Sequence, residues 1–207
     1  MYWKKKLSIL CGLMLFLLSA CASTELERRC FPTIVLIGYE NQKVSYALGF
    51  PEVPSSDDED ASINEIRVPM TEEADFEKSK TKYESNLNKI ADYNHLKILV
   101  LEEEFIEQKV LFENMLTDLA QTEEYPRNTY VCIVDDIEDL LEMEEKLPQE
   151  LGAYLEEYIN NHKMIKDSVI TLGDLIDEKE NKKLILQIPY FDTEDKYVEW
   201  NGYYTWK

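Results

Sequence analysis

An uncharged apolar run of twelve residues, Leu7 to Leu18, follows three lysines near the N-terminus. A helix that crosses the roughly 30 Å hydrocarbon core of a bilayer needs about 20 apolar residues, so this run is too short for a stable span. Its length and its positive flank are those of the hydrophobic region of a secretory signal peptide. The sequence therefore predicts that the chain is exported and that residues 1–20 are removed as a signal peptide.

The apolar run closes on Leu18-Ser19-Ala20-Cys21, which is an apolar residue, two small residues and a cysteine. Small residues let an extended backbone enter a signal peptidase, and the cysteine thiol is the acceptor of a diacylglyceryl group. An N-acyl chain on the freed amine usually follows. Two or more acyl chains give stable anchoring, at about 0.8 kcal/mol per buried CH₂. The pattern predicts Cys21 as the lipid-bearing first residue of a mature protein on the outer face of a bacterial membrane, with no other cofactor.

The chain is strongly acidic, with a formal net charge of −20. The three lysines are the only charged residues among the first twenty, so their removal takes the net charge to −23. A body this acidic lacks the basic groups that neutralise phosphates, which excludes a nucleic-acid partner. Anionic headgroups repel its net charge, so the acyl chains rather than electrostatics are expected to hold it on the membrane.

Apolar patterning predicts one α+β domain, a mixed β-sheet flanked by helices, after the signal peptide. A turn signal at residues 40–43 separates two of the strands and indicates a hairpin. Strands are expected at residues 33–38, 44–50, 96–101, 129–134, 184–189 and 197–206. Helices are expected at residues 75–91, 105–119, 136–143, 151–160 and 172–179. The predicted divisions are a signal peptide at 1–20, a lipidated N-terminus and linker at 21–30, and the domain at 31–207.

An acidic, proline-bracketed segment at residues 51–64 is expected to be an exposed loop. Its cluster Asp57–Asp60 lacks the alternating ligands and the glycine of a calcium loop, so a solvated loop is favoured over a metal site. Cys30 and Cys132 remain after export, and an oxidising location permits them to pair. Cys132 lies in an apolar run and is expected as a buried small hydrophobe, but the sequence leaves the pairing open.

The sequence offers no nucleophile with a base beside it. His95 and His162 are its only histidines, and both are expected in loop or capping positions. It contains no GxSxG, CxxC or HExxH pattern and no glycine-rich phosphate loop. The chain is therefore not expected to be an enzyme.

A series of segments follows the lipid cysteine in a recognisable order. They are Glu25–Pro32, the strand pair, Asn94–Glu103, Tyr125–Val131, Thr171–Leu175, Ile188–Pro189 and Asn201–Tyr204. In this order they resemble the N-terminal domain of the Ger(x)C family, the lipoprotein C subunit of bacterial spore nutrient-germinant receptors. The most specific piece is the strand that begins at His95-Leu96-Lys97, followed by a helix and by the Pro-Arg-Asn-Thr-Tyr strand.

The resemblance implies a non-enzymatic accessory subunit on the outer surface of the spore inner membrane. It implies assembly with two integral-membrane partners, the A and B subunits, in which most of the nutrient binding is expected. His95, Arg127 and Asn128 stand at strand starts, where side chains lock a loop or meet a partner. A purely structural role is the alternative for each of the three.

Two departures from the family pattern bear on the receptor role more than on the fold. Family members typically continue with a second domain, and this chain ends where that domain would begin. A tryptophan-containing motif often follows the lipid cysteine, and Ala22-Ser23-Thr24 stands there instead. The main rival hypothesis is a solute-binding lipoprotein of a transporter, for which the 187 residues left after cleavage are few. A lipid-anchored hydrolase is the second rival, and it lacks a nucleophile and base.

Overall fold

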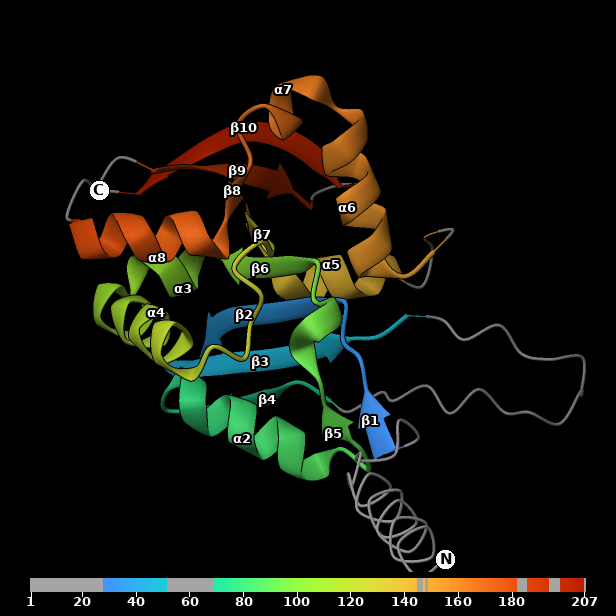
Figure 1. Ribbon diagram of the computed structural model, residues 1–207, viewed down its shortest axis with the longest axis vertical. Coiled ribbons are helices and arrows are strands. Elements are labelled where there is room, and N and C mark those ends of the chain that lie inside the picture. Colours follow the sequence, from blue (N-terminus) through green and yellow to red (C-terminus); the bar gives the residue numbers. More distant parts are fainter. Residues whose placement is uncertain are drawn as a thin grey trace, which may run out of the picture.

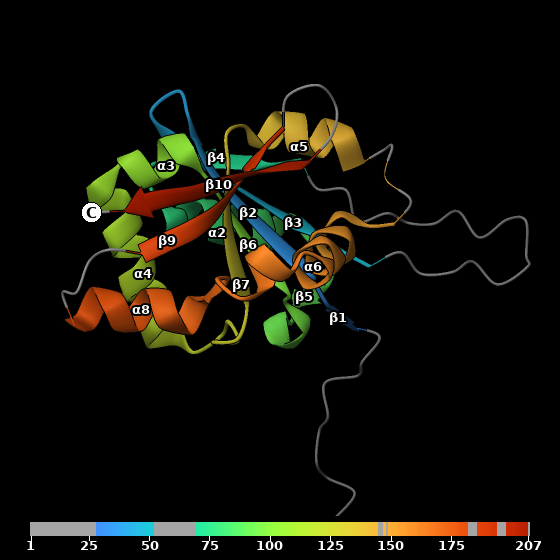
Figure 2. The same cartoon turned by 90° about the horizontal axis from the view of Figure 1, so that it is seen from above.

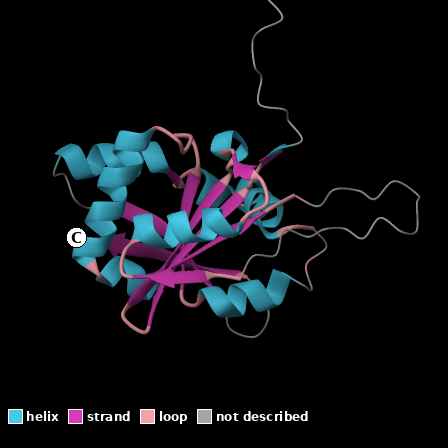
Figure 3. Ribbon diagram, turned by 90° about the horizontal axis from the view of Figure 1, so that it is seen from below, coloured by secondary structure: helices cyan, strands magenta, loops and turns pink. Residues whose placement is uncertain are grey.

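The computed structural model describes residues 28–51, 69–144, 147, 149–181, 186–193 and 198–206. These residues form an α+β domain around one mixed eight-stranded sheet, which confirms the predicted fold class (Figure 3). The strands are β1 (Arg29–Cys30), β2 (Ile34–Glu40), β3 (Lys43–Gly49), β4 (Thr71–Glu73), β5 (Ile90–Ala91), β6 (Ile98–Glu102), β7 (Tyr130–Val134), β8 (Ile170–Thr171), β9 (Leu186–Asp192) and β10 (Glu199–Trp206). The helices are α2 (Phe76–Asn86), the 3₁₀ turn η2 (Tyr93–His95), α3 (Glu103–Glu107), α4 (Lys109–Thr122), α5 (Ile137–Glu144), α6 (Leu151–Asn161), α7 (Lys163–Lys166) and α8 (Leu172–Asn181).

The large sheet has the strand order β10-β9-β7-β6-β2-β3-β4, and β8 pairs with β7. Strands β2, β6, β7 and β9 run parallel, while β3, β4, β8 and β10 pair antiparallel with their neighbours. A separate two-stranded parallel sheet joins β1 to β5. Because the four parallel strands point the same way, their starts gather along one side of the sheet, the amino edge, and their ends along the other, the carboxyl edge.

The parallel strands at the centre are continuous apolar runs, as expected for strands covered on both faces. Residues 34–37 of β2, 98–101 of β6 and 131–134 of β7 are all buried. Helices α2, α4 and α8 pack in a row on one face, and α5 and α6 cover the other (Figures 1 and 2). The core therefore lies in two layers, one on each side of the sheet.

Side-chain caps explain where several helices begin. The Asp75 carboxylate accepts from the Lys78 N–H at 2.9 Å at the start of α2. Glu150 accepts from the Gly152 and Ala153 N–H groups at the start of α6, both at 2.8 Å. Such caps satisfy backbone donors that have no partner inside the helix.

The predicted hairpin is confirmed, since β2 and β3 pair around Asn41 and Gln42, which both have positive φ. That backbone fits the right-handed twist of a two-residue hairpin turn. The helix predicted over 75–91 was wrong at its end, because α2 stops at Asn86 and residues 90–91 pair with β1. The helix predicted over 105–119 was also wrong in part: Gln108 (φ −78°, ψ 66°) separates α3 from α4.

Cys30 and Cys132 are both free and buried, so they do not pair in this structure. Residues 29–30, placed in the linker by the sequence, form β1. The signal peptide, Cys21 and nearly all of the predicted 51–64 loop lie outside the described residues. Of the helices that are described, none has the length and apolarity to cross a bilayer.

Candidate functional site

The amino edge brings together the segments that the sequence singled out. The Lys97 N–H donates to the Thr33 carbonyl at 2.8 Å, and the Tyr130 N–H donates to the Lys97 carbonyl at 2.9 Å. These bonds align the starts of β2, β6 and β7. His95 therefore precedes one strand and Arg127 and Asn128 precede its neighbour, all along the same edge.

His95 lies exposed at the end of η2, with its ring edge-on to Phe31 at 5.2 Å between centroids. The Asp92 carboxylate caps this turn through the Asn94 N–H at 3.2 Å and its side-chain amide at 2.7 Å. The imidazole thus rests on the segment that joins β1 to β2. It contacts a hydrophobic ring, which fits a structural residue at a strand start.

Arg127 fastens the turn before β7 to the start of α8. The Gly173 N–H donates to the Arg127 carbonyl at 2.8 Å, and the guanidinium donates to the Gly173 carbonyl at 3.1 Å and to Asp177 at 2.6 Å. A Cβ on Gly173 would lie 3.0 Å from the Arg127 carbonyl oxygen, so this close approach favours glycine. Asn128 is exposed in the same turn, which the Thr129 N–H closes on the Pro126 carbonyl at 3.1 Å.

The N-terminal chain reaches the domain at this same edge. In the β1–β5 pair Arg29 lies opposite Ile90, and the Asp92 N–H donates to the Cys30 carbonyl at 2.8 Å. Arg29 also donates to the Asp92 carboxylate at 2.5 Å. The hydrogen bond from Arg29 is the main reason that the pKa of Asp92 is lowered. Lys89 and Ile90 are exposed beside this pair, and 59% of Ile90 is accessible.

Beneath the amino edge lies a buried network of hydroxyls that sequence reasoning missed. The Tyr46 hydroxyl is 2.9 Å from those of Tyr93 and Tyr125, and Tyr93 donates to Glu84 at 2.6 Å. The rings of Tyr93 and Tyr125 stack at 4.5 Å, and the Lys80 ammonium lies 5.4 and 5.5 Å from their centroids. Burial is the main cause that raises the pKa of all three tyrosines, so they stay protonated and hold the edge together.

The carboxyl edge is built from carboxylates. Glu102 accepts from the Tyr39 N–H at 2.7 Å and from the Ile137 N–H at 3.2 Å, which ties β2 and α5 to the end of β6. Its pKa is raised, chiefly by burial, although the two backbone donors act in the opposite direction. The Asp135 carboxylate accepts from the backbone N–H of Thr193 at 3.0 Å. These donors are uncharged groups, so they hold the carboxylates in place without neutralising them.

The two thiols are buried, and the His162 ring packs on a tyrosine. Burial raises the pKa of the Cys132 thiol to about 12, and burial also raises that of Cys30. Both thiols are therefore protonated at neutral pH and are weak nucleophiles. The His162 ring stacks on Tyr158 at 4.1 Å and its Nδ1 lies 2.7 Å from the Tyr158 carbonyl oxygen. Across the described part of the chain, no three His, Cys, Asp or Glu side chains are grouped so as to hold a metal ion.

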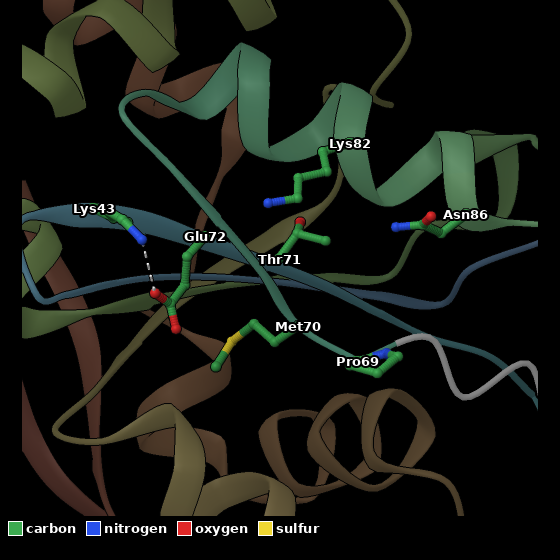
Figure 4. A pocket seen from close by; sticks show the side chains of 7 residues that line it. All are labelled: Lys43, Pro69, Met70, Thr71, Glu72, Lys82 and Asn86. Carbon is green, nitrogen blue, oxygen red and sulfur yellow. Dashed lines mark ion pairs between the residues drawn. The ribbon is translucent and has the colours of Figure 1, made fainter.

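A polar hollow of about 330 Å³ lies between α2 and β4 (Figure 4). It is lined by Lys43, Pro69, Met70, Thr71, Glu72, Lys82 and Asn86. Lys43 lies 3.7 Å from Glu72, and Lys82 lies 2.7 Å from Glu73. Since each lysine has a glutamate partner, the hollow presents no excess positive charge to an anion.

The chain matches the family model of the spore germination protein N-terminal domain over residues 22–193. It belongs to this family. The resemblance to the Ger(x)C N-terminal domain predicted from the sequence is thereby confirmed. Comparisons with curated proteins and with solved structures found no match.

The family match extends over the sheet from β1 to β9, so both edges described above belong to the germination-protein domain. His95, Arg127 and Asn128 all lie within it. The structure brings these three residues to one edge but gives them different surroundings. Arg127 joins α8 to the turn before β7. His95 is exposed and packs on Phe31, and Asn128 is exposed in the turn before β7.

Proposed function

We propose that this chain is a lipid-anchored, non-catalytic accessory subunit of a spore nutrient-germinant receptor. The observation that carries the proposal is the family match, which begins at residue 22, directly after the predicted lipid cysteine. A germination-protein domain on an acylated cysteine is a soluble body held at a membrane surface. Its work is then to bind and position other proteins there.

The anchor is proposed to be Cys21, after removal of residues 1–20 as a signal peptide. Residues 21–30 would serve as the lipidated N-terminus and linker, and residues 31–207 as the domain. Diacylglyceryl and N-acyl chains would supply the membrane attachment, on the outer face of the cell membrane or of the spore inner membrane. The lipobox and the short uncharged run before it support this.

A non-catalytic role is supported by the state of the groups that could react. The two thiols are buried with raised pKa values, and both histidine rings pack on neighbouring aromatic rings. Nucleophilic catalysis needs a base within hydrogen-bond reach of a nucleophile. Binding of partner proteins requires no such pair.

The proposed partners are the A and B integral-membrane subunits of the receptor. Because the N-terminal chain joins the domain at the amino edge, His95 and Asn128 are the proposed contact residues, and Arg127 is proposed to hold their edge in shape. A tagged chain purified from spore membranes in mild detergent is expected to bring both subunits with it. Cys21→Ser is the matched control, because it removes the anchor and leaves the domain unchanged.

Mass spectrometry of the purified chain can detect both the lipid modification and the co-purified partner proteins in one sample. The proposal expects cleavage before residue 21, the mass of the acyl chains on Cys21, and peptides of both membrane subunits. Recovery of an acylated chain with transport proteins, and without germinant-receptor subunits, would favour the solute-binding hypothesis. An uncleaved chain without acyl mass would contradict the anchor.

A further inference from the structure

The outer strand β10 is irregular at its centre. Among the described residues it pairs with β9 alone, in an antiparallel arrangement (Figure 1). The register of the two strands shifts between Trp200 and Tyr203, so Asn201 and Gly202 have no Cα partner on β9. A bulge of this kind leaves a residue unpaired and interrupts the ladder of backbone hydrogen bonds. The backbone at Asn201 and Gly202 is therefore less constrained than in the rest of the strand.

Gly202 lies in this shift for a backbone reason. Its φ is +91°, a conformation that glycine adopts readily and that other residues disfavour. A Cβ at this position would have no heavy atom within 4 Å. Packing therefore does not exclude a side chain there, and the space beside this stretch of backbone is open.

The residue before this glycine, Asn201, has an exposed and weakly held side chain. The hydrogen bond from its Nδ2 to Asp192 Oδ2 is 3.5 Å long, beyond the usual range of about 2.7–3.2 Å. Asn201 is also the one asparagine of the sequence that is followed by glycine. At every other asparagine, the side chain of the next residue stands beside the backbone nitrogen.

We infer that Asn201 is a site of spontaneous modification, at which solvent water converts the side-chain amide into a carboxylate. The reaction starts when the Gly202 backbone nitrogen, having lost its proton to hydroxide, attacks Cγ of Asn201. The bond between this nitrogen and Cγ forms, the Cγ–Nδ2 bond breaks, and Nδ2 leaves as ammonia with a proton taken from water. The product of this step is a cyclic imide that contains the backbone nitrogen.

Water then opens the cyclic imide at either of its carbonyl carbons. Breaking the bond between the nitrogen and Cγ gives aspartate with a normal peptide bond. Breaking the bond between the nitrogen and the main-chain carbonyl carbon gives isoaspartate, in which the chain runs through Cγ and gains a methylene group. Overall, one water is consumed and one ammonia is released, and no oxidant, reductant or enzyme takes part.

Proximity explains why this position is the reactive one. The nitrogen and Cγ belong to neighbouring residues, so the attack is intramolecular and depends on whether the two atoms can reach a near-attack geometry. The ladder of a regular strand fixes the backbone dihedrals of an asparagine and hinders that approach. The register shift at Asn201 and the φ of Gly202 relax this restraint.

The modification is expected to weaken the pairing of β9 with β10. The new carboxylate stands where the amide now donates to Asp192, so an attractive contact becomes a repulsive one. Isoaspartate also inserts a methylene group into the backbone of the strand. This inference is independent of the lipid anchor and of the receptor role in the proposed function.

The test incubates the full chain, purified in mild detergent, at mildly alkaline pH in water labelled with ¹⁸O. Peptide mass spectrometry should find aspartate and isoaspartate at residue 201, each with one heavy oxygen, at a rate that rises with pH. Asn128 is the internal control, since it is exposed but is followed by Thr129. It should be modified about tenfold more slowly, because its next residue obstructs the near-attack geometry.

Two variants test the role of the glycine. Gly202→Ala places a side chain beside the nitrogen and disfavours the positive φ, so it should slow the reaction about tenfold. Asn201→Gln keeps the glycine but requires a larger ring to close, so it should also be slow, and it serves if Gly202→Ala does not fold. A variant that reacts as fast as the native chain would overturn the mechanism.

The native chain unfolded in urea gives the reference rate. If the unfolded chain is modified at residue 201 and the folded chain is not, the fold protects the residue and the inference is overturned. Equal rates at residues 201 and 128 of the folded chain would overturn it as well.

Asn201→Asp reproduces one product and tests its effect on the strand pair. Backbone hydrogen exchange of residues 199–206 should be about fivefold faster than in the uncharged variant Asn201→Gln, the effect of two like charges about 4 Å apart in water. Equal exchange in the two variants would contradict the expected weakening of the pairing.

Discussion

Several carboxylates at the two edges of the sheet are held by different means. At the amino edge, carboxylates such as Asp92 and Asp177 meet arginines, and the buried hydroxyls beneath them satisfy one another. At the carboxyl edge, Glu102 and Asp135 accept from backbone N–H groups. The first arrangement neutralises charge and the second only positions it.

The difference teaches that order and neutrality are separate properties of a surface. Backbone donors position the Glu102 carboxylate and a guanidinium positions Asp92, yet only the guanidinium also offsets the negative charge. A carboxylate can therefore be well ordered whether or not a basic group neutralises it.

The largest effect is expected from Tyr46→Phe, which tests whether the amino edge depends on its buried hydroxyls. The change leaves the Tyr93 and Tyr125 hydroxyls without their shared partner in a fully buried place. A buried polar group that loses its partner costs about 1–3 kcal/mol. The free energy of unfolding, measured in urea, should fall by that amount. Tyr154→Phe, at a half-buried position on α6, is the control and should change it by less than about 0.5 kcal/mol.

Glu102→Gln sharpens the comparison at the carboxyl edge. Each oxygen of the carboxyl group, protonated or not, can accept one of the two backbone donors, whereas the nitrogen of an amide accepts none. The variant is expected to be less stable than the native chain. Because burial raises the pKa of Glu102, the native contribution is fully present below the unfolded pKa of about 4.3 and is lost as pH rises through the folded value. The difference between the unfolding free energies of the native chain and the variant, measured in urea, should therefore narrow from pH 4 upward. A difference that widens would contradict this expectation.

Asp92→Asn should give the opposite dependence on pH at the amino edge, with a smaller effect. The hydrogen bond from Arg29 lowers the pKa of Asp92, so its contribution is present above the unfolded pKa of about 3.9 and is lost as pH falls through the folded value. In the same urea series, Asp92→Asn is expected to have a lower unfolding free energy than the native chain at neutral pH, and this difference should disappear in acid. If the difference in unfolding free energy from the native chain changes with pH in the same direction for Asp92→Asn and Glu102→Gln, the contrast between the edges is contradicted.

How much of the fold the sequence could predict depends on how local each feature is along the chain. The hairpin and the buried strands follow from patterns within a few residues, and they were predicted. The end of α2 was missed because Ile90 and Ala91 pair with β1, a strand about 60 residues earlier in the chain. Helix periodicity alone contains no signal of that pairing.

The site was predictable only in part, for the same reason. His95, Arg127 and Asn128 were proposed because each precedes an apolar run; the structure places them along one edge, and their role stays a prediction. The tyrosine network was missed because its hydroxyls come from β3, η2 and the segment before β7, which meet only in the folded chain. The acids that follow each parallel strand were the available signal for the carboxyl edge, but acids are so common in this chain that they did not stand out.

The smallest stability effect is expected from Arg127→Met. The ion pair with Asp177 is exposed on both sides, so it contributes little, and the hydrogen bond to the Gly173 carbonyl adds a modest amount. A loss of about 0.5–1 kcal/mol in urea unfolding is expected. Asn128→Ala, in the same turn, is the control and should be near neutral. A loss above about 2 kcal/mol for Arg127→Met would contradict the expectation that the exposed contacts of Arg127 with Asp177 and Gly173 contribute little to stability.

The central claim is that this chain serves a spore germinant receptor from a lipid anchor. The most direct measurement is nutrient-triggered loss of spore refractility in three strains: one with the native gene, one with the gene deleted, and one whose only copy carries Cys21→Ser. The account predicts a normal response in the first strain and a loss of response to at least one nutrient in the other two. If all three strains respond alike to every nutrient tested, the claim is contradicted.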